Sequence, residues 1–173
     1  MKKIISLILI LLTITAFSSC KRGMYQDITY REGGISFTLP NTMRRTNYED
    51  YDFYFTNRAV VFTAIKLTDE FFKENELDPS ITAEEYTMYC IEKNGLDINQ
   101  MEYKYDEERG LHNFRYTYDN EEDTNIFYYV VIAGDVGNIW YIEMCCSGDS
   151  SSDYIYTFGE WKRTISTYSE ANE

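Results

Sequence analysis

Apolar and polar residues alternate over several stretches of this chain, which is the pattern of β-strands. The alternation first appears at Ile35–Leu39, ends at Pro40, and resumes at Phe53. It predicts strands over residues 35–39, 53–56, 59–67, 101–105, 111–118, 125–133 and 138–146. Because short turns join the later strands, we expect them to pair antiparallel. The two most apolar strands, 125–133 and 138–146, should form the centre of the sheet.

Two segments between these strands carry helical signals. Thr68–Asp69 can cap a short helix over residues 70–75. Thr82 and Glu85 then match a capping box, in which each residue satisfies backbone or side-chain groups of the other. The helix that follows is predicted to run to about Lys93. Its expected apolar stripe consists of Tyr86, Tyr89, Cys90 and Lys93.

A third helix is predicted near the end of the chain, over about residues 153–168. The Ser-rich loop 147–153 can supply its cap. Its apolar stripe should pack on the sheet, with Gly159 allowing a close approach. That stripe comprises Tyr154, Phe158, Trp161, Ile165 and Tyr168. The fold class predicted from all these elements is α+β, with an antiparallel sheet of about six to seven strands flanked by helices.

The first twenty residues have a different pattern, which is typical of an export signal. Lys2 and Lys3 precede an uncharged apolar run of about 14 residues, shorter than the roughly 20 that a membrane-spanning helix needs. Small residues then lead into Cys20, and this arrangement resembles the lipobox of bacterial lipoproteins. Phe17 stands where that box usually has Leu. We expect cleavage before Cys20 and lipidation of its thiol; plain secretion and an uncleaved anchor are the alternatives.

These signals divide the chain into four parts. Residues 1–19 are predicted to be a lipoprotein signal peptide and residues 20–27 a lipidated tether. Residues 28–168 should form a single domain, and residues 169–173 a polar tail. Cleavage would leave 154 of the 173 residues, enough for one domain with a hydrophobic core. The domain is expected on the extracytoplasmic side of the cell membrane, joined to the bilayer by a diacylglyceryl group on Cys20.

Charge restricts the partners that this domain can have. The formal charge of the whole chain is −13, and losing Lys2 and Lys3 with the leader would make it −15. Nucleic-acid binding needs a basic surface, so we expect no nucleic acid partner. A cationic protein or peptide of the envelope is compatible with this charge, and so is a metal ion. The charge is also compatible with a surface that only keeps the protein soluble.

Tyrosine and cysteine are the next informative residues. Most of the 17 tyrosines fall at alternating strand positions, where they fill a pleated surface or form a stacking face. Cys145 and Cys146 are strand neighbours and must point to opposite faces. Cys90 lies in a predicted helix. We expect buried free thiols, with a bridge from Cys90 to Cys145 or Cys146 as the alternative that an oxidising compartment permits.

The strongest ligand candidate is the acidic turn after residue 118. Asp119, Glu121, Glu122 and Asp123 could supply several of the oxygens that Ca²⁺ prefers, helped by the acidic residues 106–108. The spacing is not that of an EF-hand, and a solvated hairpin is the alternative. His112 is the only histidine, and no nucleophile, zinc or phosphate-loop motif accompanies it. We therefore expect no enzyme activity and no cofactor.

The order of elements resembles the PsbP-like superfamily. The residues that carry the resemblance are Gly34–Pro40 at the first strand, Thr82–Tyr86 at the middle helix, and Phe158 with residues 161–165 at the last helix. The resemblance covers about residues 28–168 and implies an α/β/α sandwich around an antiparallel sheet. It implies no ligand residues, since members include photosystem II subunits, a nuclear transport cofactor and bacterial lipoproteins without an assigned role.

Three functional hypotheses follow. The first is a membrane-anchored binding or assembly module without enzyme activity. The second is a receptor for a small ligand or cation such as Ca²⁺, which a concave, tyrosine-lined pocket between sheet and helix would favour. The third is an enzyme, which would require His112 to lie beside a buried carboxylate or cysteine in one cleft.

Overall fold

The computed structural model describes residues 26–99, 101–119 and 125–169, which form two antiparallel sheets and three helices. The large sheet has the strand order β3-β4-β5-β9-β8-β7-β6, and the small sheet has the order β1-β2-β10. The large sheet comprises β3 (Arg44–Arg45), β4 (Phe53–Thr56), β5 (Val60–Lys66), β6 (Glu102–Asp106), β7 (Leu111–Asp119), β8 (Asn125–Ala133) and β9 (Trp140–Ser147). The remaining elements are β1 (Asp27–Glu32), β2 (Ile35–Pro40), β10 (Ser166–Thr167), α2 (Asp69–Glu74), α3 (Ala83–Lys93) and α4 (Ser151–Lys162), which follows a 3-10 turn at Gly148–Ser150.

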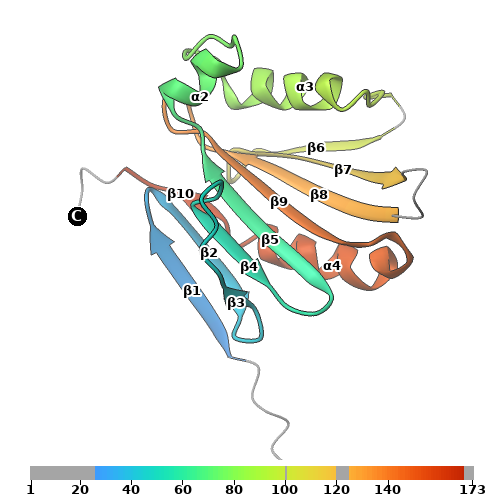
Figure 1. Cartoon of the computed structure of the whole chain (residues 1–173). Helices are drawn as coiled ribbons and strands as arrows, with labels where there is room; N and C mark the ends of the chain where they lie inside the picture. Colours follow the sequence, from blue (N-terminus) through green and yellow to red (C-terminus); the bar gives the residue numbers. More distant parts are fainter. Residues whose placement is uncertain (1–25, 100, 120–124, 170–173) are drawn as a thin grey trace, which may run out of the picture.

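The large sheet is the middle layer of the domain (Figure 1). Helices α2 and α3 lie on one side, called here the α3 side, and their buried residues pack with Phe114, Val130 and Ile132. Helix α4 and the small sheet lie on the other side, the α4 side, where Phe37 and Phe158 join the larger core cluster. The predicted α+β class, with an antiparallel sheet between layers of helix, is therefore confirmed.

Strands β8 and β9 occupy the centre of the large sheet, as their apolar sequences predict. Strand β9 pairs with β8 along one edge and with β5 along the other. Its even-numbered residues from Trp140 to Cys146 are buried on the α4 side. Tyr141, Glu143 and Cys145 alternate with them and face the α3 side. The two faces of one strand thus contribute to two different environments.

Local sequence signals determine the starts of α2 and α3. The Thr68 side chain accepts a hydrogen bond from the Phe71 N–H at the start of α2. At α3, Thr82 and Glu85 form both halves of the predicted capping box. The buried stripe of α3 differs from the predicted one, because Tyr89 is only partly buried and Lys93 is exposed. Its buried residues are Ala83, Tyr86, Thr87, Cys90 and Ile91.

The prediction for the last helix is wrong at both ends. Helix α4 begins at Ser151 without a side-chain cap at Ser150, and it ends at Lys162 rather than near residue 168. The Thr164 hydroxyl donates to the Trp161 carbonyl and accepts from the Thr38 N–H at 2.9 Å. The chain then pairs with β2 as β10. A Cβ at Gly159 would meet nothing within 4 Å, so this glycine does not serve a close approach.

The small sheet was not expected from the alternation of residues. Strand β2, predicted as part of the main sheet, pairs instead with β1 and β10. Gly33 and Gly34 form the turn between β1 and β2 with φ of 67° and 93°. A Cβ on Gly33 would also touch the Trp140 ring at 3.4 Å, so the hairpin packs closely on the core. The seventh strand of the large sheet is the two-residue β3.

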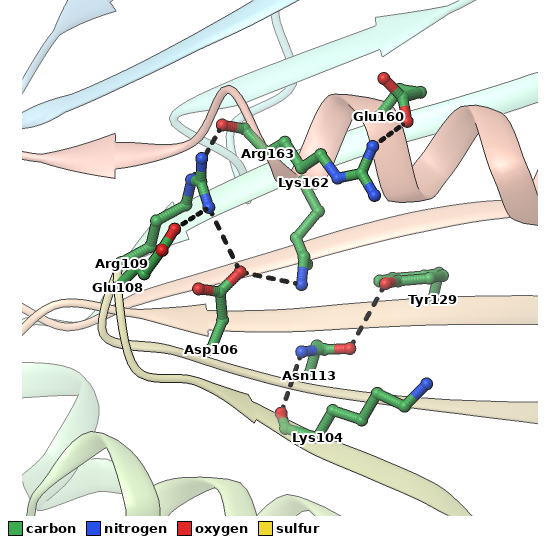
Figure 2. Close-up of polar contacts among 9 residues, drawn as sticks. All are labelled: Lys104, Asp106, Glu108, Arg109, Asn113, Tyr129, Glu160, Lys162 and Arg163. Carbon is green, nitrogen blue, oxygen red and sulfur yellow. Dashed lines mark hydrogen bonds and ion pairs between the residues drawn. The ribbon is translucent and has the colours of Figure 1, made fainter.

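A polar cluster joins the β6–β7 turn to the end of α4 (Figure 2). The Lys162 ammonium lies 3.2 Å from the Asp106 carboxylate, and both side chains are largely buried. Arg109 lies 3.6 Å from Asp106 and donates from Nε to the Arg163 carbonyl at 3.2 Å. In contrast, the ion pair between Glu160 and Arg163 is exposed. The cluster fixes the end of α4 against the sheet.

We predict that Asp106→Asn destabilises the domain by about 1–3 kcal/mol, because it leaves the largely buried Lys162 ammonium without its carboxylate. Glu160→Gln is the matched control at the same helix end, and it should change stability by about 0.5 kcal/mol or less. Urea unfolding of both variants measures the difference. Equal effects of the two substitutions would show that the Asp106 contact contributes no more than a surface pair.

Candidate functional site

The α3 side of the large sheet is only partly covered by helices. Helix α3 packs on β7 and β8, while β4, β5 and β9 carry no helix over most of their length on this side (Figure 1). Tyrosines gather on this side of the sheet, and we call this group the tyrosine face. Its tyrosines are Tyr54 on β4, Tyr116 and Tyr118 on β7, Tyr128 on β8, and Tyr48 and Tyr51 from the loop before β4.

Strand register brings these side chains together. Tyr116 lies opposite Tyr128 across β7 and β8, and their rings stack with centroids 4.9 Å apart. On the β4 side, the Tyr54 ring lies 4.4 Å from Tyr48 and 5.7 Å from Tyr51. Tyr48 and Tyr118 keep 53% and 55% of their surface exposed. Rings that are held in place and still exposed are features of protein contact surfaces.

Glu143 lies between the two tyrosine groups, on the central strand. Its carboxylate accepts a hydrogen bond of 2.7 Å from the Tyr141 hydroxyl. Burial raises the pKa of Glu143, and the bond from Tyr141 opposes that rise only in part. The negative charge of Glu143 in turn adds to burial in raising the pKa of Tyr51, Tyr116 and Tyr128. A partly buried carboxylate is thus surrounded by aromatic rings.

The three described cysteines are free thiols, as expected, and the bridge that the sequence left open does not form. Cys146 packs in the core of the α4 side, while Cys90 and Cys145 belong to the α3 side. Burial raises the pKa of Cys90 to about 11 and that of Cys145 to about 12. Both thiols therefore stay protonated at neutral pH and are poor nucleophiles.

A cleft of about 620 Å³ lies at the other end of the α3 side, where the start of α3 meets the β6–β7 and β8–β9 connections. The His112 Nδ1 lies 2.9 Å from the Tyr103 hydroxyl, and the Tyr105 ring stacks on the imidazole with centroids 4.5 Å apart. Burial lowers the pKa of His112, and the nearby Glu84 opposes this shift. Gly134 lines the cleft, and only glycine fits there because a Cβ would lie 2.0 Å from the Asn138 carbonyl oxygen.

This cleft offers stacking surfaces and one neutral imidazole. The hydrogen-bonding and ring contacts of His112 are with Tyr103 and Tyr105, and the two acidic residues that line the cleft, Glu84 and Asp135, are both exposed. The arrangement that the enzyme hypothesis requires, a histidine beside a buried carboxylate or cysteine, is therefore not found among the described residues. The cleft presents aromatic rings, of which Tyr105 stacks on the imidazole.

The predicted cation site is not assembled in the described part of the chain. Asp119 is exposed at the end of β7, while Glu121, Glu122 and Asp123 lie outside the described residues. The acidic residues 106–108, expected to help, lie at the opposite end of β7, about 26 Å away along the strand. Asp106 and Glu108 pair there with Arg109. Among residues 26–99, 101–119 and 125–169, no three metal-ligating side chains cluster. The predicted lipidation site, Cys20, also lies outside the described residues.

Sequence comparison matches no family model and no curated protein. Solved structures do match. Cyanobacterial PsbP from Synechocystis sp. PCC 6803 is 14% identical with a TM-score of 0.52, covering 87% of this chain and 98% of that one. The fold is PsbP-like.

Two further structures share this PsbP-like fold. The Ran-binding protein Mog1p of Saccharomyces cerevisiae is 10% identical with a TM-score of 0.54, covering 83% of this chain and 96% of its own. LpqN of Mycobacterium tuberculosis, described as involved in cell envelope biogenesis, is 12% identical with a TM-score of 0.50, covering 83% and 91%. At identities this low, the structural matches establish only the arrangement of helices and strands, so the function has to be inferred from the site itself.

We predict that Glu143→Gln stabilises the domain at pH 7 and that this gain disappears on acidification. Because burial raises the pKa of Glu143 above its ordinary value of 4.5, the folded state holds the proton more tightly than the unfolded state. Stability of the native protein should therefore fall as pH rises through the interval above 4.5. Gln has no proton to lose, so its advantage should be present at pH 7 and absent near pH 4. The melting temperatures of wild type and Glu143→Gln are measured at pH 7 and at pH 4. If the variant differs from wild type by the same amount at both pH values, the raised pKa of Glu143 is wrong.

Proposed function

We propose that this chain is a lipid-anchored module of the bacterial cell envelope that binds or assembles another protein without catalysing a reaction. The observation that carries the proposal is the tyrosine face, an exposed aromatic surface on a well-packed sheet. Aromatic residues held in place lose little conformational freedom on binding, and they are enriched where proteins bind one another.

The leader and Cys20 support the membrane location of this module. A diacylglyceryl group on Cys20 would hold the chain at the bilayer, and β1 begins at Asp27. Seven extended residues reach at most about 25 Å, so the domain would stay close to the membrane. Within the described ranges no helix is long and apolar enough to cross a membrane. The envelope role stated for LpqN, which shares the fold, agrees with this location.

The proposal is tested by photo-cross-linking in the bacterial envelope. A photoreactive residue in place of Tyr118, on the tyrosine face, should capture one defined protein. The control position is Tyr156, which is 72% exposed on α4. The same probe at Tyr156 should capture no defined species. Equal capture from both positions, or only abundant bystanders from Tyr118, would argue against a contact surface here.

The anchor is tested in the same cells. Wild-type protein should fractionate with membranes and begin at Cys20 with the mass of a diacylglyceryl group. Cys20→Ser should lose both the lipid mass and the tight membrane association, while Cys145→Ser should keep them. Tight membrane binding of Cys20→Ser at unchanged size would overturn the lipid anchor.

The cleft at His112 favours a second candidate function, a receptor for a small ligand. This cleft is concave, it lies between sheet and helix, and Tyr103 and Tyr105 line it. Such a pocket is the usual form of a small-molecule site. A ring-shaped ligand could stack on Tyr105, which is 51% exposed.

For this second function we predict that a soluble saccharide or short peptide raises the melting temperature of wild-type protein, and that Tyr105→Ala removes the shift while Tyr156→Ala keeps it. The reason is that the stacking surface is lost only in the first variant. A panel of such compounds in a thermal-shift assay provides the measurement. The absence of any shift at millimolar concentration would dismiss the cleft as a receptor site.

A further inference from the structure

A carboxylate without a cation lies in the middle of the tyrosine face. Glu143 is partly buried on β9, and among the described residues its carboxylate accepts a hydrogen bond from the Tyr141 hydroxyl alone. Within the described part of the chain, no lysine or arginine forms an ion pair with it. Removing a carboxylate from water without a paired charge costs free energy. A function in binding would explain why this position is charged in an otherwise apolar strand.

The residues around Glu143 are arranged by strand register. Val130 on β8 and Thr63 on β5 lie directly opposite it and are buried, whereas Glu143 itself is partly exposed. Tyr128 lies opposite Cys145, so its ring is diagonal to the carboxylate on the same face. Diagonal neighbours in a sheet are within reach of long or aromatic side chains. A cation held by Glu143 would therefore also contact the rings of Tyr128 and its stacked partner Tyr116.

We propose that this position receives a lysine or arginine side chain of the partner protein, with its cationic head between the Glu143 carboxylate and the rings of Tyr116 and Tyr128. This inference rests on the proposed function and specifies its chemistry. The carboxylate supplies a charge-assisted hydrogen bond and the rings supply cation–π attraction. The net charge of −13 also favours a basic partner.

The chain contains an internal example of the same combination. Arg45 pairs with the Glu32 carboxylate at 3.0 Å, and its guanidinium lies over the Phe53 ring, 4.9 Å from the centroid.

A metal ion fits the position beside Glu143 less well than a basic side chain. Glu143 is the one carboxylate there among the described residues, and hard cations require six or more oxygens. The neighbouring Cys145 thiol is protonated, so it is a poor ligand.

The test uses the purified full chain in detergent with three blocked peptides: hexalysine, hexaarginine and hexaglutamine. The basic peptides should bind and the neutral one should not. Glu143→Gln should weaken basic-peptide binding about tenfold or more, because it removes the buried charge. Glu70→Gln, which changes an exposed carboxylate on α2, should stay within about twofold. Equal affinity of wild type and Glu143→Gln would overturn the inference.

Two substitutions of Tyr128 distinguish the contribution of its ring to peptide binding from that of its hydroxyl, in the same assay. Tyr128→Phe keeps the ring and should bind within about twofold of wild type, whereas Tyr128→Leu should weaken binding about threefold or more. Melting temperatures of each variant verify that it is folded. A loss with Phe as large as with Leu would mean that the hydroxyl, not the ring, recognises the peptide, and it would overturn the cation–π part of the proposal.

The cross-link at position 118 distinguishes failure of the inference from failure of the proposed function. The captured partner should disappear when Glu143→Gln is combined with the probe. If the same partner is captured with and without Glu143, the inferred contact with a basic side chain is wrong, but the proposed binding function is supported. If no partner is captured but the peptides bind through Glu143, the site stands and the protein-assembly function falls. Capture of a second copy of this chain would overturn the basic-partner assignment.

Discussion

Strand β9 is hydrogen-bonded to β5 on one edge and to β8 on the other along nearly its whole length. Because side chains alternate across a strand, this one register decides which residues enter which layer. It places Trp140, Ile142 and Met144 in the core beneath α4. It also places Tyr141, Glu143 and Cys145 on the opposite side. A shift of one residue would bury the carboxylate in the main core and move the tryptophan to the α3 side.

The two sides of the sheet consequently have different tasks. On the α4 side, the small sheet, Phe158 and the polar cluster around Asp106 close the layer, and this side holds the larger cluster of buried apolar residues. On the α3 side, helices cover one end of the sheet and leave aromatic rings exposed at the other. Tyrosine suits such a surface, since its ring packs on neighbours while its hydroxyl remains hydrated. The closed side supplies stability, and the open side is free to bind.

Features determined by nearby residues could be predicted from the sequence, and features determined by distant ones could not. The capping box of Thr82 and Glu85 and the central position of β8 and β9 follow from local pattern and hydrophobicity. The end of α4 does not, because β2 offers an edge to Ser166 and Thr167 that the helical stripe cannot reveal. Two-residue strands such as β3 leave no detectable periodicity.

The site was predictable only in part, for the same reason. Alternating tyrosines indicated an aromatic face, but not which end of it the helices would leave open. Glu143 gave a signal that was overlooked, namely a single charge within the apolar run Trp140–Cys146. The acidic residues 106–108 and Asp119 looked like neighbours because one short strand separates them, yet an extended strand carries its two ends far apart. Side-chain identity identified candidates, and sheet geometry decided which of them meet.

The small sheet has a consequence for the order of assembly. Its strands come from residues 27–40 and 166–167, so β10, the last strand of the domain, pairs with β2 near the start of the domain. Contacts between such distant positions incur a large loop-closure entropy and form late. A chain that becomes free to fold from its amino end first cannot complete this sheet until residues 166–167 are also free. The topology thus couples the final closure of the domain to the release of nearly the whole polypeptide.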